Sequence, residues 1–237
     1  MTIEEFSNEF DLLLNSESFL QEFGTDMAPT SLNEYEKSLF LTRSQEEIVK
    51  GLYSGSLGGV SFEEIESLRR YLDPLVKTAK PEVMNTNPVD SLSNHSTFYK
   101  LPEDLWYITY ESADIEDPYC QDNPSVQVVP MRQDEWNKVR INPFRKPNKR
   151  RVIRLDSGKG TVELVSSSNI GNYLIRYISR PSPIILVPLS EDNLSIGGLT
   201  EVTECKLPDS IHRYILDRAV KIALMSKTSL NNNNTSK

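Results

Sequence analysis

The chain has 237 residues, enough to bury the core of one domain or of two small ones. Only 38% of the residues are hydrophobic, yet ten Tyr, eight Phe and two Trp exceed what disordered chains carry, so the composition indicates a folded protein with much exposed surface. The net charge is −8, and two Cys with two His offer no metal-ligand spacing.

The start of the chain is acidic and lacks the basic and apolar regions of a signal peptide. No stretch reaches the roughly 18 apolar residues that a transmembrane helix needs. Two cysteines far apart in the sequence, Cys120 and Cys205, are typical of a reducing compartment, although a single disulfide is compatible with them. We therefore expect a protein without a membrane segment or an export signal.

The first 80 residues repeat one helix-start pattern. A hydroxyl residue stands three positions before a glutamate at three places: Thr2–Glu5, Ser31–Glu34 and Ser61–Glu64. This is the spacing of a capping box, in which two side chains satisfy backbone N–H groups of the first helical turn. Apolar residues follow each pair at helical spacing, and the second helix continues or restarts near Ser44. The sequence predicts a helical bundle over residues 1–80.

Residues 81–96 have the composition of a loop, and short β-type runs follow them. The expected strands are Thr97–Lys100, Leu105–Glu111, Val126–Met131, Arg150–Leu155, Gly160–Val165, Tyr173–Ile178 and Ile184–Leu189. Residues 156–160 have the pattern of a hairpin turn, and Gln133–Val139 that of a short helix. Because the connections look too short for crossover helices, we expect an antiparallel β-domain over residues 97–206.

The chain then returns to a helical pattern. Pro208 stands at an early helical position, and an apolar stripe runs from Ile211 to Ala223. A helix over residues 207–227 is expected to complete the N-terminal bundle. Residues 228–237 form a low-complexity polar tail that we expect to be disordered in isolation. The predicted fold class is α+β: an N-terminal helical bundle, completed by a C-terminal helix, with an inserted antiparallel β-domain.

No catalytic motif is visible in the sequence. The glycines of residues 55–59 resemble a phosphate loop, but they follow a predicted helix and not a strand. His212 has no Cys or Ser partner and is better interpreted as a packed residue, and the acidic residues of 114–117 as a solvated turn. Trp106 and Trp136 are expected to be core anchors. We predict no enzymatic activity, no metal site and no cofactor.

One constellation stands out, because eight basic residues and no acidic one lie within 17 positions. They are Lys138, Arg140, Arg145, Lys146, Lys149, Arg150, Arg151 and Arg154. The rest of the chain carries 18 basic against 34 acidic residues, a balance of −16. This asymmetry predicts a surface that meets a polyanion or an acidic partner. The alternative is a solvated face whose charge is offset by acidic neighbours.

The chemistry of this basic run leaves its partner open. Against duplex DNA it would contact phosphates without reading the sequence. Apart from Phe144 the run has no aromatic residue on which single-stranded bases could stack. On the predicted strand, alternation places Arg150 and Arg154 on one face and Arg151 on the other. An acidic protein surface fits as well as a nucleic acid.

The order of parts and several segments carry a resemblance. The segments include Leu32-Asn-Glu-Tyr-Glu-Lys-Ser, Phe98-Tyr-Lys-Leu-Pro-Glu-Asp-Leu-Trp, Gln133-Asp-Glu-Trp, Asn142-Pro-Phe-Arg and His212-Arg-Tyr-Ile-Leu-Asp-Arg-Ala-Val. With the Leu-Pro-x-x-x-His start of the final helix, they resemble the head-to-tail adaptors of short-tailed phages (tubular tail protein A). The likeness is stronger to the ring proteins of crAss-like phages and covers residues 30–227.

The resemblance implies a structural virion protein, made in the host cytoplasm and placed at the head–tail junction. It implies a twelve-fold ring beneath the portal, in the conduit through which genomic DNA passes without sequence recognition, with the portal protein, other tail or ring proteins and further copies of itself as partners. The β-domain would face neighbours or the tail. The segment that reaches the portal would be Thr228, Ser229, Leu230, Asn231, Asn232, Asn233 and Asn234.

A ring also constrains the basic run. Each subunit of a closed ring must present one face to a different face of the next. Basic walls around a DNA channel would hold the genome back through phosphate contacts. We therefore prefer the basic run as a contact between subunits or with the portal. A nucleic-acid-binding accessory protein without sequence specificity is the alternative.

Overall fold

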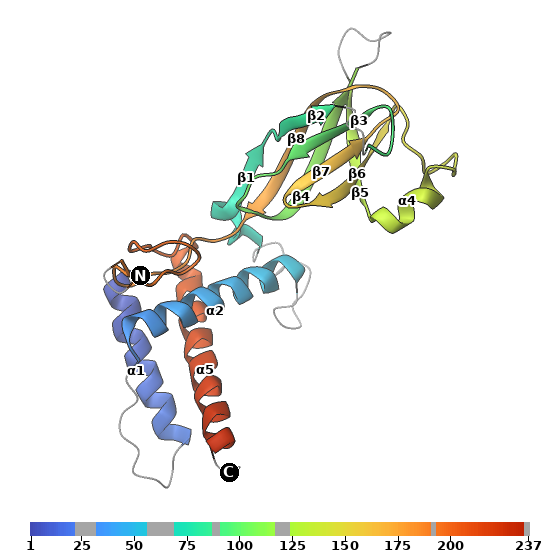
Figure 1. Ribbon diagram of the computed structural model, residues 1–237. Coiled ribbons are helices and arrows are strands. Elements are labelled where there is room, and N and C mark those ends of the chain that lie inside the picture. Colours follow the sequence, from blue (N-terminus) through green and yellow to red (C-terminus); the bar gives the residue numbers. More distant parts are fainter. Residues whose placement is uncertain (22–31, 56–68, 87–90, 117–123, 191–192, 235–237) are drawn as a thin grey trace. The chain divides into compact units, whose positions relative to one another are not determined.

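The computed structural model describes residues 1–21, 32–55, 69–86, 91–116, 124–190 and 193–234 (Figure 1). The chain divides into two compact units. The first, here called the helical unit, contains Met1–Leu75 and Pro181–Lys237, and the second, the sheet unit, contains Val76–Arg180. The division falls at other residues than the expected 97 and 206, because two early strands join the sheet and residues 181–206 belong with the helices. All described strands lie in the sheet unit and the three long helices lie in the helical unit, which confirms the α+β class.

The helical unit contains α1 (Ile3–Gln21), α2 (Glu34–Ser54), a short 3-10 turn η1 (Asp73–Leu75) and α5 (Asp209–Asn234). The first predicted capping box is confirmed, because Thr2 N donates to Glu5 Oε2 (2.7 Å) and Glu5 N donates to Thr2 Oγ1 (3.2 Å). The second is wrong by two residues. Asn33 caps α2, its Oδ1 accepting from Glu36 N (2.8 Å) while its own N–H donates to Glu36 Oε2 (3.0 Å). The third lies outside the described residues.

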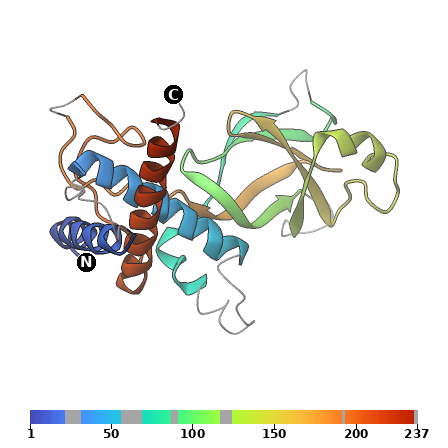
Figure 2. The ribbon, with the colours of Figure 1, turned by 90° about the horizontal axis from the view of Figure 1, so that it is seen from below.

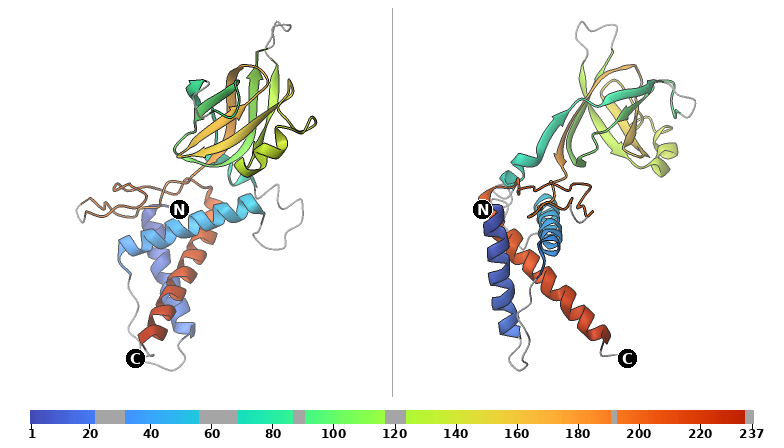
Figure 3. Two further views of the ribbon diagram at one scale, coloured as in Figure 1. Left: turned by 45° about the vertical axis from the view of Figure 1, so that its right-hand side comes forward. Right: turned by 60° about the vertical axis from the view of Figure 1, so that its left-hand side comes forward.

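α5 packs on both other long helices. Its stripe Ile211, Ile215, Ala219 and Val220 is buried, as are Phe6 and Phe10 of α1 and Leu41 and Val49 of α2. The Phe6 and His212 rings lie 5.2 Å apart, and Ser44 Oγ donates to the Ile215 carbonyl (2.6 Å). α2 runs across α5 and not alongside it (Figure 2). α1 and α5 start side by side and diverge toward their far ends (Figure 3). The helices therefore share one core near the start of α5.

Residues 181–206 return the chain to α5 as an irregular segment. The predicted strand Ile184–Leu189 is wrong, because only isolated bridges form here, Ile185 with Thr203 and Ile196 with Leu199. Side chains of α2 bind the backbone of this segment instead. Thr42 Oγ1 accepts from Ile184 N (3.0 Å), and Ser38 Oγ accepts from Leu186 N (3.1 Å). The apolar run is buried against a helix and has no neighbouring strand.

The sheet unit contains eight described strands in one sheet. They are β1 (Val76–Ala79), β2 (Glu82–Thr86), β3 (Ser96–Lys100), β4 (Leu105–Ile115), β5 (Ser125–Met131), β6 (Arg151–Gly158), β7 (Thr161–Val165) and β8 (Ile170–Ser179). Their order is β1-β8-β4-β5-β6-β7-β3-β2. The predicted strands from β3 to β8 are confirmed. β1 was not predicted, and β2 lies within the expected loop of residues 81–96.

The prediction of a purely antiparallel domain is wrong for one pair of strands. β5 and β6 are parallel, with Val128 opposite Val152, while the other neighbours are antiparallel. The helix α4 (Gln133–Val139) and the loop after it carry the chain back to the start of β6. A parallel pair needs such a crossover, and these 19 intervening residues are long enough for one.

The sheet curls on itself. β1 and β2 lie at opposite ends of the strand order, yet only Lys80 and Pro81 separate them in the chain. Two linking residues span at most about 11 Å, so the two edges approach each other. The inner face buries Tyr99, Val152 and Tyr173, and α4 covers the outer face of β6. Trp136 of α4 lies in this second cluster, which confirms it as a core anchor.

Candidate interaction surface

The basic run starts on α4 and continues through the loop to β6. α4 buries Trp136 and Val139 against Ile153 and Leu155 of β6, which leaves Lys138 exposed. The chain then forms residues 140–150, here called the basic loop, before β6 begins at Arg151. Figure 1 shows this loop extending beyond α4 at the margin of the sheet unit. The packing of α4 on the sheet therefore fixes where the loop begins.

Two asparagines shape the basic loop. Asn142 Oδ1 accepts from Phe144 N (2.9 Å), and the Asn142 carbonyl accepts from Lys146 N (2.9 Å). Asn148 Oδ1 accepts from Arg150 N (2.8 Å), and Asn148 N donates to the Arg151 carbonyl (3.1 Å). Asparagine favours such turns because its short side chain bonds the backbone two residues on. The loop presents its side chains from a defined backbone.

Most of the basic residues are exposed. Lys138, Arg140, Arg145, Lys146, Lys149 and Arg150 all lie at the surface. Within the described part of the chain, Arg140, Arg145 and Lys146 have no acidic group in ion-pair distance. The alternative of a face offset by acidic neighbours therefore does not describe these three residues. Their charge is available to a partner.

The last two arginines of the run have other surroundings. Arg151 is half-buried, and its Nη1 donates to the Phe144 carbonyl (3.1 Å), which ties β6 to the loop. Arg154 lies inside the curled sheet, donates to Glu111 Oε1, and has Nε 3.3 Å from Asp156 Oδ1. Its side chain is only 12% exposed. Arg154 therefore stabilises the sheet unit and is not part of the exposed surface.

Two exposed apolar side chains lie among the exposed charges. Phe144 is 86% exposed and Ile141 is 77% exposed, more than any other large hydrophobic residue in the described part of the chain. Sequence reasoning noted Phe144 only as a lone aromatic residue and missed Ile141. The available signal was an apolar residue on each side of Asn142-Pro143, a turn sequence. An exposed apolar pair rimmed by arginines is typical of a contact with protein.

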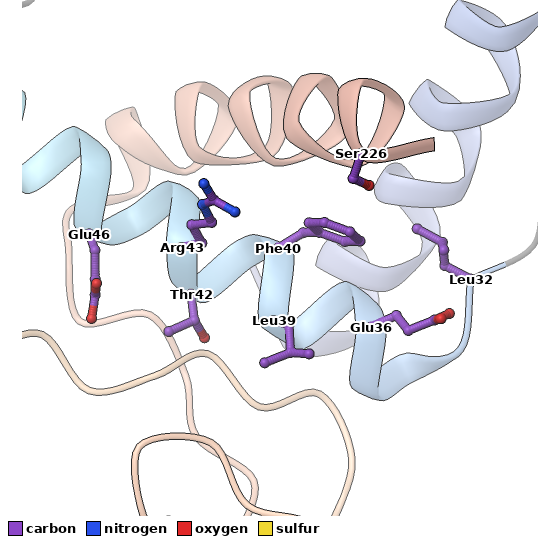
Figure 4. A pocket seen from close by; sticks show the side chains of 8 residues that line it. All are labelled: Leu32, Glu36, Leu39, Phe40, Thr42, Arg43, Glu46 and Ser226. Carbon is purple, nitrogen blue, oxygen red and sulfur yellow. The ribbon is translucent and has the colours of Figure 1, made fainter. Parts of the chain in front are cut away.

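The helical unit carries an open pocket of 630 Å³ along α2 (Figure 4). Its apolar lining is Leu32, Leu39 and Phe40, and its charged lining is Glu36, Arg43 and Glu46. Ser226 of α5 closes one side. The α2 residues recur every three or four positions, so they form one stripe along the helix. Leu39 remains 40% exposed there.

The C-terminal tail is not a separate segment in the structure. α5 continues through residues 228–234 and ends at Asn234, so the expected disorder of this stretch is wrong. Asparagine is a poor helix former, but extending an existing helix costs far less than starting one. The candidate residues Thr228 to Asn234 therefore form the last turns of α5. These turns belong to the helical unit, and the basic loop belongs to the sheet unit.

The remaining candidates for chemistry are structural. His212 is buried, as predicted, and its Nε2 donates to the Leu207 carbonyl (2.8 Å). Cys205 is a free thiol whose pKa burial raises to about 11, so it is protonated at neutral pH, and Cys120 lies outside the described residues. Gly55 ends α2 with a φ of 67°.

Across the described ranges, no group of three or more His, Cys, Asp or Glu side chains is placed to hold a metal ion. None of the described helices is long and apolar enough to cross a membrane.

Comparison with known proteins identifies the family of this chain. A family model described as phage tail ring protein 3/4 matches residues 1–235. The chain belongs to the phage tail ring protein family. The ring protein is 46% identical over 237 residues to Ring protein 3 of Bacteroides phage crAss001, covering 98% of this chain and 99% of that protein. It is 34% identical over 232 residues to Ring protein 4/5 of the same phage, covering 94% and 92%.

These relatives confirm the resemblance to crAss-like phage ring proteins. The ring protein is a structural component of a phage virion. Association with other tail or ring proteins follows from membership of a ring. The exposed basic loop and the pocket along α2 are two surfaces in the described residues with the chemistry of a contact.

Proposed function

We propose that the ring protein forms a closed ring, of twelve copies, in the head-to-tail connector below the portal. The ring is part of the conduit through which the genome is packaged and ejected. Membership of the ring protein family and the names of two full-length relatives support this proposal. The role is mechanical: the subunit holds neighbours around a channel, and no chemical step is required of it.

One observation supports ring assembly by this chain itself. The helical unit carries 11 basic against 21 acidic residues, a net charge of −10, while the sheet unit carries 15 against 13, a net charge of +2. Arg140, Arg145 and Lys146 of the basic loop place positive charge without an acidic partner among the described residues on the second unit. Every subunit thus has two units of opposite net charge, which can attract each other across a head-to-tail interface between identical subunits.

The portal contact is assigned to the end of α5. Residues 228–234 are uncharged, polar except for Leu230, and helical, and they extend past Ala223, the last fully buried residue of α5 among the described side chains. A polar helix end beyond the core suits a contact made after the subunit has folded. The same arrangement leaves the basic loop for a neighbouring subunit.

Native mass spectrometry of the purified protein, alone and with portal protein, tests the proposal. We expect rings of twelve copies, formed by the protein alone or on addition of portal. Measurement in both conditions is needed because a subunit that assembles only on portal would be monomeric by itself. A species that stays monomeric in both conditions, ignores portal and binds duplex DNA with a steep salt dependence would instead identify a nucleic-acid-binding accessory protein.

A further inference from the structure

The basic loop has the composition of an interface anchor. Phe144 and Ile141 project from a backbone that Asn142 and Asn148 hold, and Arg140, Arg145 and Lys146 surround them. Binding energy at protein interfaces concentrates in aromatic and arginine side chains that become buried at the centre of a contact. Because the loop is already ordered, little conformational entropy is lost when it docks.

A partner for this loop needs an apolar pocket with acidic groups at its rim. Burying Phe144 requires a concave apolar surface, since an exposed aromatic ring has 150 to 250 Å² or so to cover. The flanking guanidinium groups require carboxylates nearby, because a buried unpaired charge would cost more than the apolar contact contributes.

The pocket along α2 meets both requirements. Leu32, Leu39 and Phe40 line it, and its charged lining has two carboxylates, Glu36 and Glu46, against one guanidinium, Arg43. Its volume of 630 Å³ is within the range of pockets that bind small ligands. The surrounding unit is strongly acidic, with a net charge of −10. An electrostatic field of this sign attracts the basic loop and repels a second helical unit.

We propose that the basic loop of one subunit docks in the α2 pocket of the next copy of this chain, with Phe144 entering that pocket. The inference deepens the proposed function, on which it rests, by assigning the two faces of the subunit interface. Each copy has one loop and one pocket. The contact is therefore heterologous, and it repeats from subunit to subunit until the ring closes.

Complementary variants test the contact. Phe144→Asp removes the anchor but keeps the pocket, and Leu39→Asp spoils the pocket but keeps the loop. Each variant alone is expected to lose self-association by about 30-fold or more. A mixture of the two retains one intact loop and one intact pocket, so it should form a one-to-one dimer and nothing larger. Tyr214→Asp, at an aromatic residue on α5 that is 69% exposed, is the matched control and should assemble like the wild type.

A disulfide trap provides a second readout that does not depend on affinity. In a background with Cys120→Ser and Cys205→Ser, the pair Phe144→Cys and Leu39→Cys should cross-link into a ladder of covalent oligomers upon oxidation, alone or on portal. Each single cysteine variant should give at most a dimer. Both exposed sites are expected to tolerate the substitutions, which circular dichroism and thermal unfolding check.

The outcomes separate this inference from the function on which it rests. If the wild type forms no ring with or without portal, the proposed function fails. If rings form while Phe144→Asp and Leu39→Asp assemble normally, or if the disulfide forms only within one chain, the docking proposal alone is wrong. Loss of portal binding with normal ring assembly would likewise overturn it and assign the basic loop to the portal.

Discussion

Arg154 and Glu111 form an ion pair inside the curled sheet, with side chains that are only 12% and 7% exposed. Tyr173 donates its hydroxyl hydrogen to the other carboxylate oxygen, Glu111 Oε2 (3.0 Å). Burial raises the pKa of the Glu111 carboxyl, and the Arg154 charge and the Tyr173 hydrogen bond oppose that shift. Arg154, the most buried arginine of the basic run, therefore links β6 to Glu111 of β4 within the sheet unit.

Replacing Arg154 should destabilise the fold and not only an interface. Arg154→Met leaves the Glu111 carboxylate buried without its counter-charge, which costs about 3 to 5 kcal/mol of unfolding free energy. Urea denaturation followed by circular dichroism measures this loss. The double variant Arg154→Met with Glu111→Leu should recover at least half of it, because no charge is then left buried.

The matched control for Arg154 is another arginine of the same run. Arg145 is exposed and has no acidic partner among the described residues, so Arg145→Met should change the unfolding free energy by less than about 0.5 kcal/mol. An equal loss at both positions would contradict the assignment of Arg154 to the core.

Ser38 links α2 to the segment that follows the sheet unit. Its Oγ donates to the Glu34 carbonyl (2.6 Å) and accepts from Leu186 N (3.1 Å), and the side chain is fully buried. Ser38→Ala removes the acceptor and leaves the Leu186 N–H unpaired in the core. We expect a loss of about 1 to 3 kcal/mol in the free energy of unfolding.

A second serine variant shows whether that loss is specific. Ser16→Ala removes a hydroxyl that donates only to the Leu13 carbonyl on an exposed part of α1. Its effect should stay within about 0.5 kcal/mol in the same urea titration. Equal effects of the two variants would mean that the 181–206 segment gains little from its bond to α2.

His212 should make the stability of the ring protein depend on pH. Burial lowers the pKa of its imidazole, and the Met1 ammonium, 3.1 Å from Nδ1, acts in the same direction. The unfolded chain gains a proton as the pH falls through the ordinary value of 6.5, whereas the folded chain does so only at a lower pH. Stability is therefore highest above 6.5 and declines as the pH falls from there toward the folded pKa.

The loss of stability at low pH can be no larger than the difference between the folded and unfolded pKa values of His212 allows. Each unit of separation between the two pKa values corresponds to about 1.4 kcal/mol. His212→Gln keeps a donor for the Leu207 carbonyl but does not titrate, so its unfolding free energy should vary less between about pH 7.5 and about pH 5.5. Parallel pH profiles for wild type and variant would show that other groups control stability in this range.

The strands and helices with a clear period were predictable, and those without one were not. β1 is exposed along most of its length, and β2 follows it after two residues. Apolar and polar residues do not alternate along either strand. The run Ile184–Leu189 has the apolar content of a strand, but its N–H groups bond to Ser38 and Thr42, which are more than 140 positions away. Partners so distant in sequence leave no local pattern.

The charge of the candidate surface could be predicted from the sequence. Which of its residues are exposed and which are paired inside the sheet unit could not. A run of eight basic residues cannot show which of them is paired, and Glu111 lies 43 positions before Arg154. The capping box of α2 had two overlapping solutions, Ser31–Glu34 and Asn33–Glu36, with the same spacing. Exposure of Ile141 follows from the way Trp136 and Val139 dock α4 on the sheet, which depends on tertiary packing.

Removing residues 228–237 should separate portal binding from ring formation. The proposed portal contact lies on the last turns of α5, beyond Ala223, so the truncation leaves the described core of the helical unit intact. We expect unchanged ring assembly, a thermal midpoint close to that of the full chain, and a portal affinity at least about tenfold weaker, measured by binding to surface-immobilised portal protein.

Replacing Asn231 to Asn234 with alanine preserves or strengthens the helix while removing the amide groups. A similar loss in that variant would assign the contact to the amides, whereas full portal affinity in the truncated protein would remove the end of α5 from the portal interface.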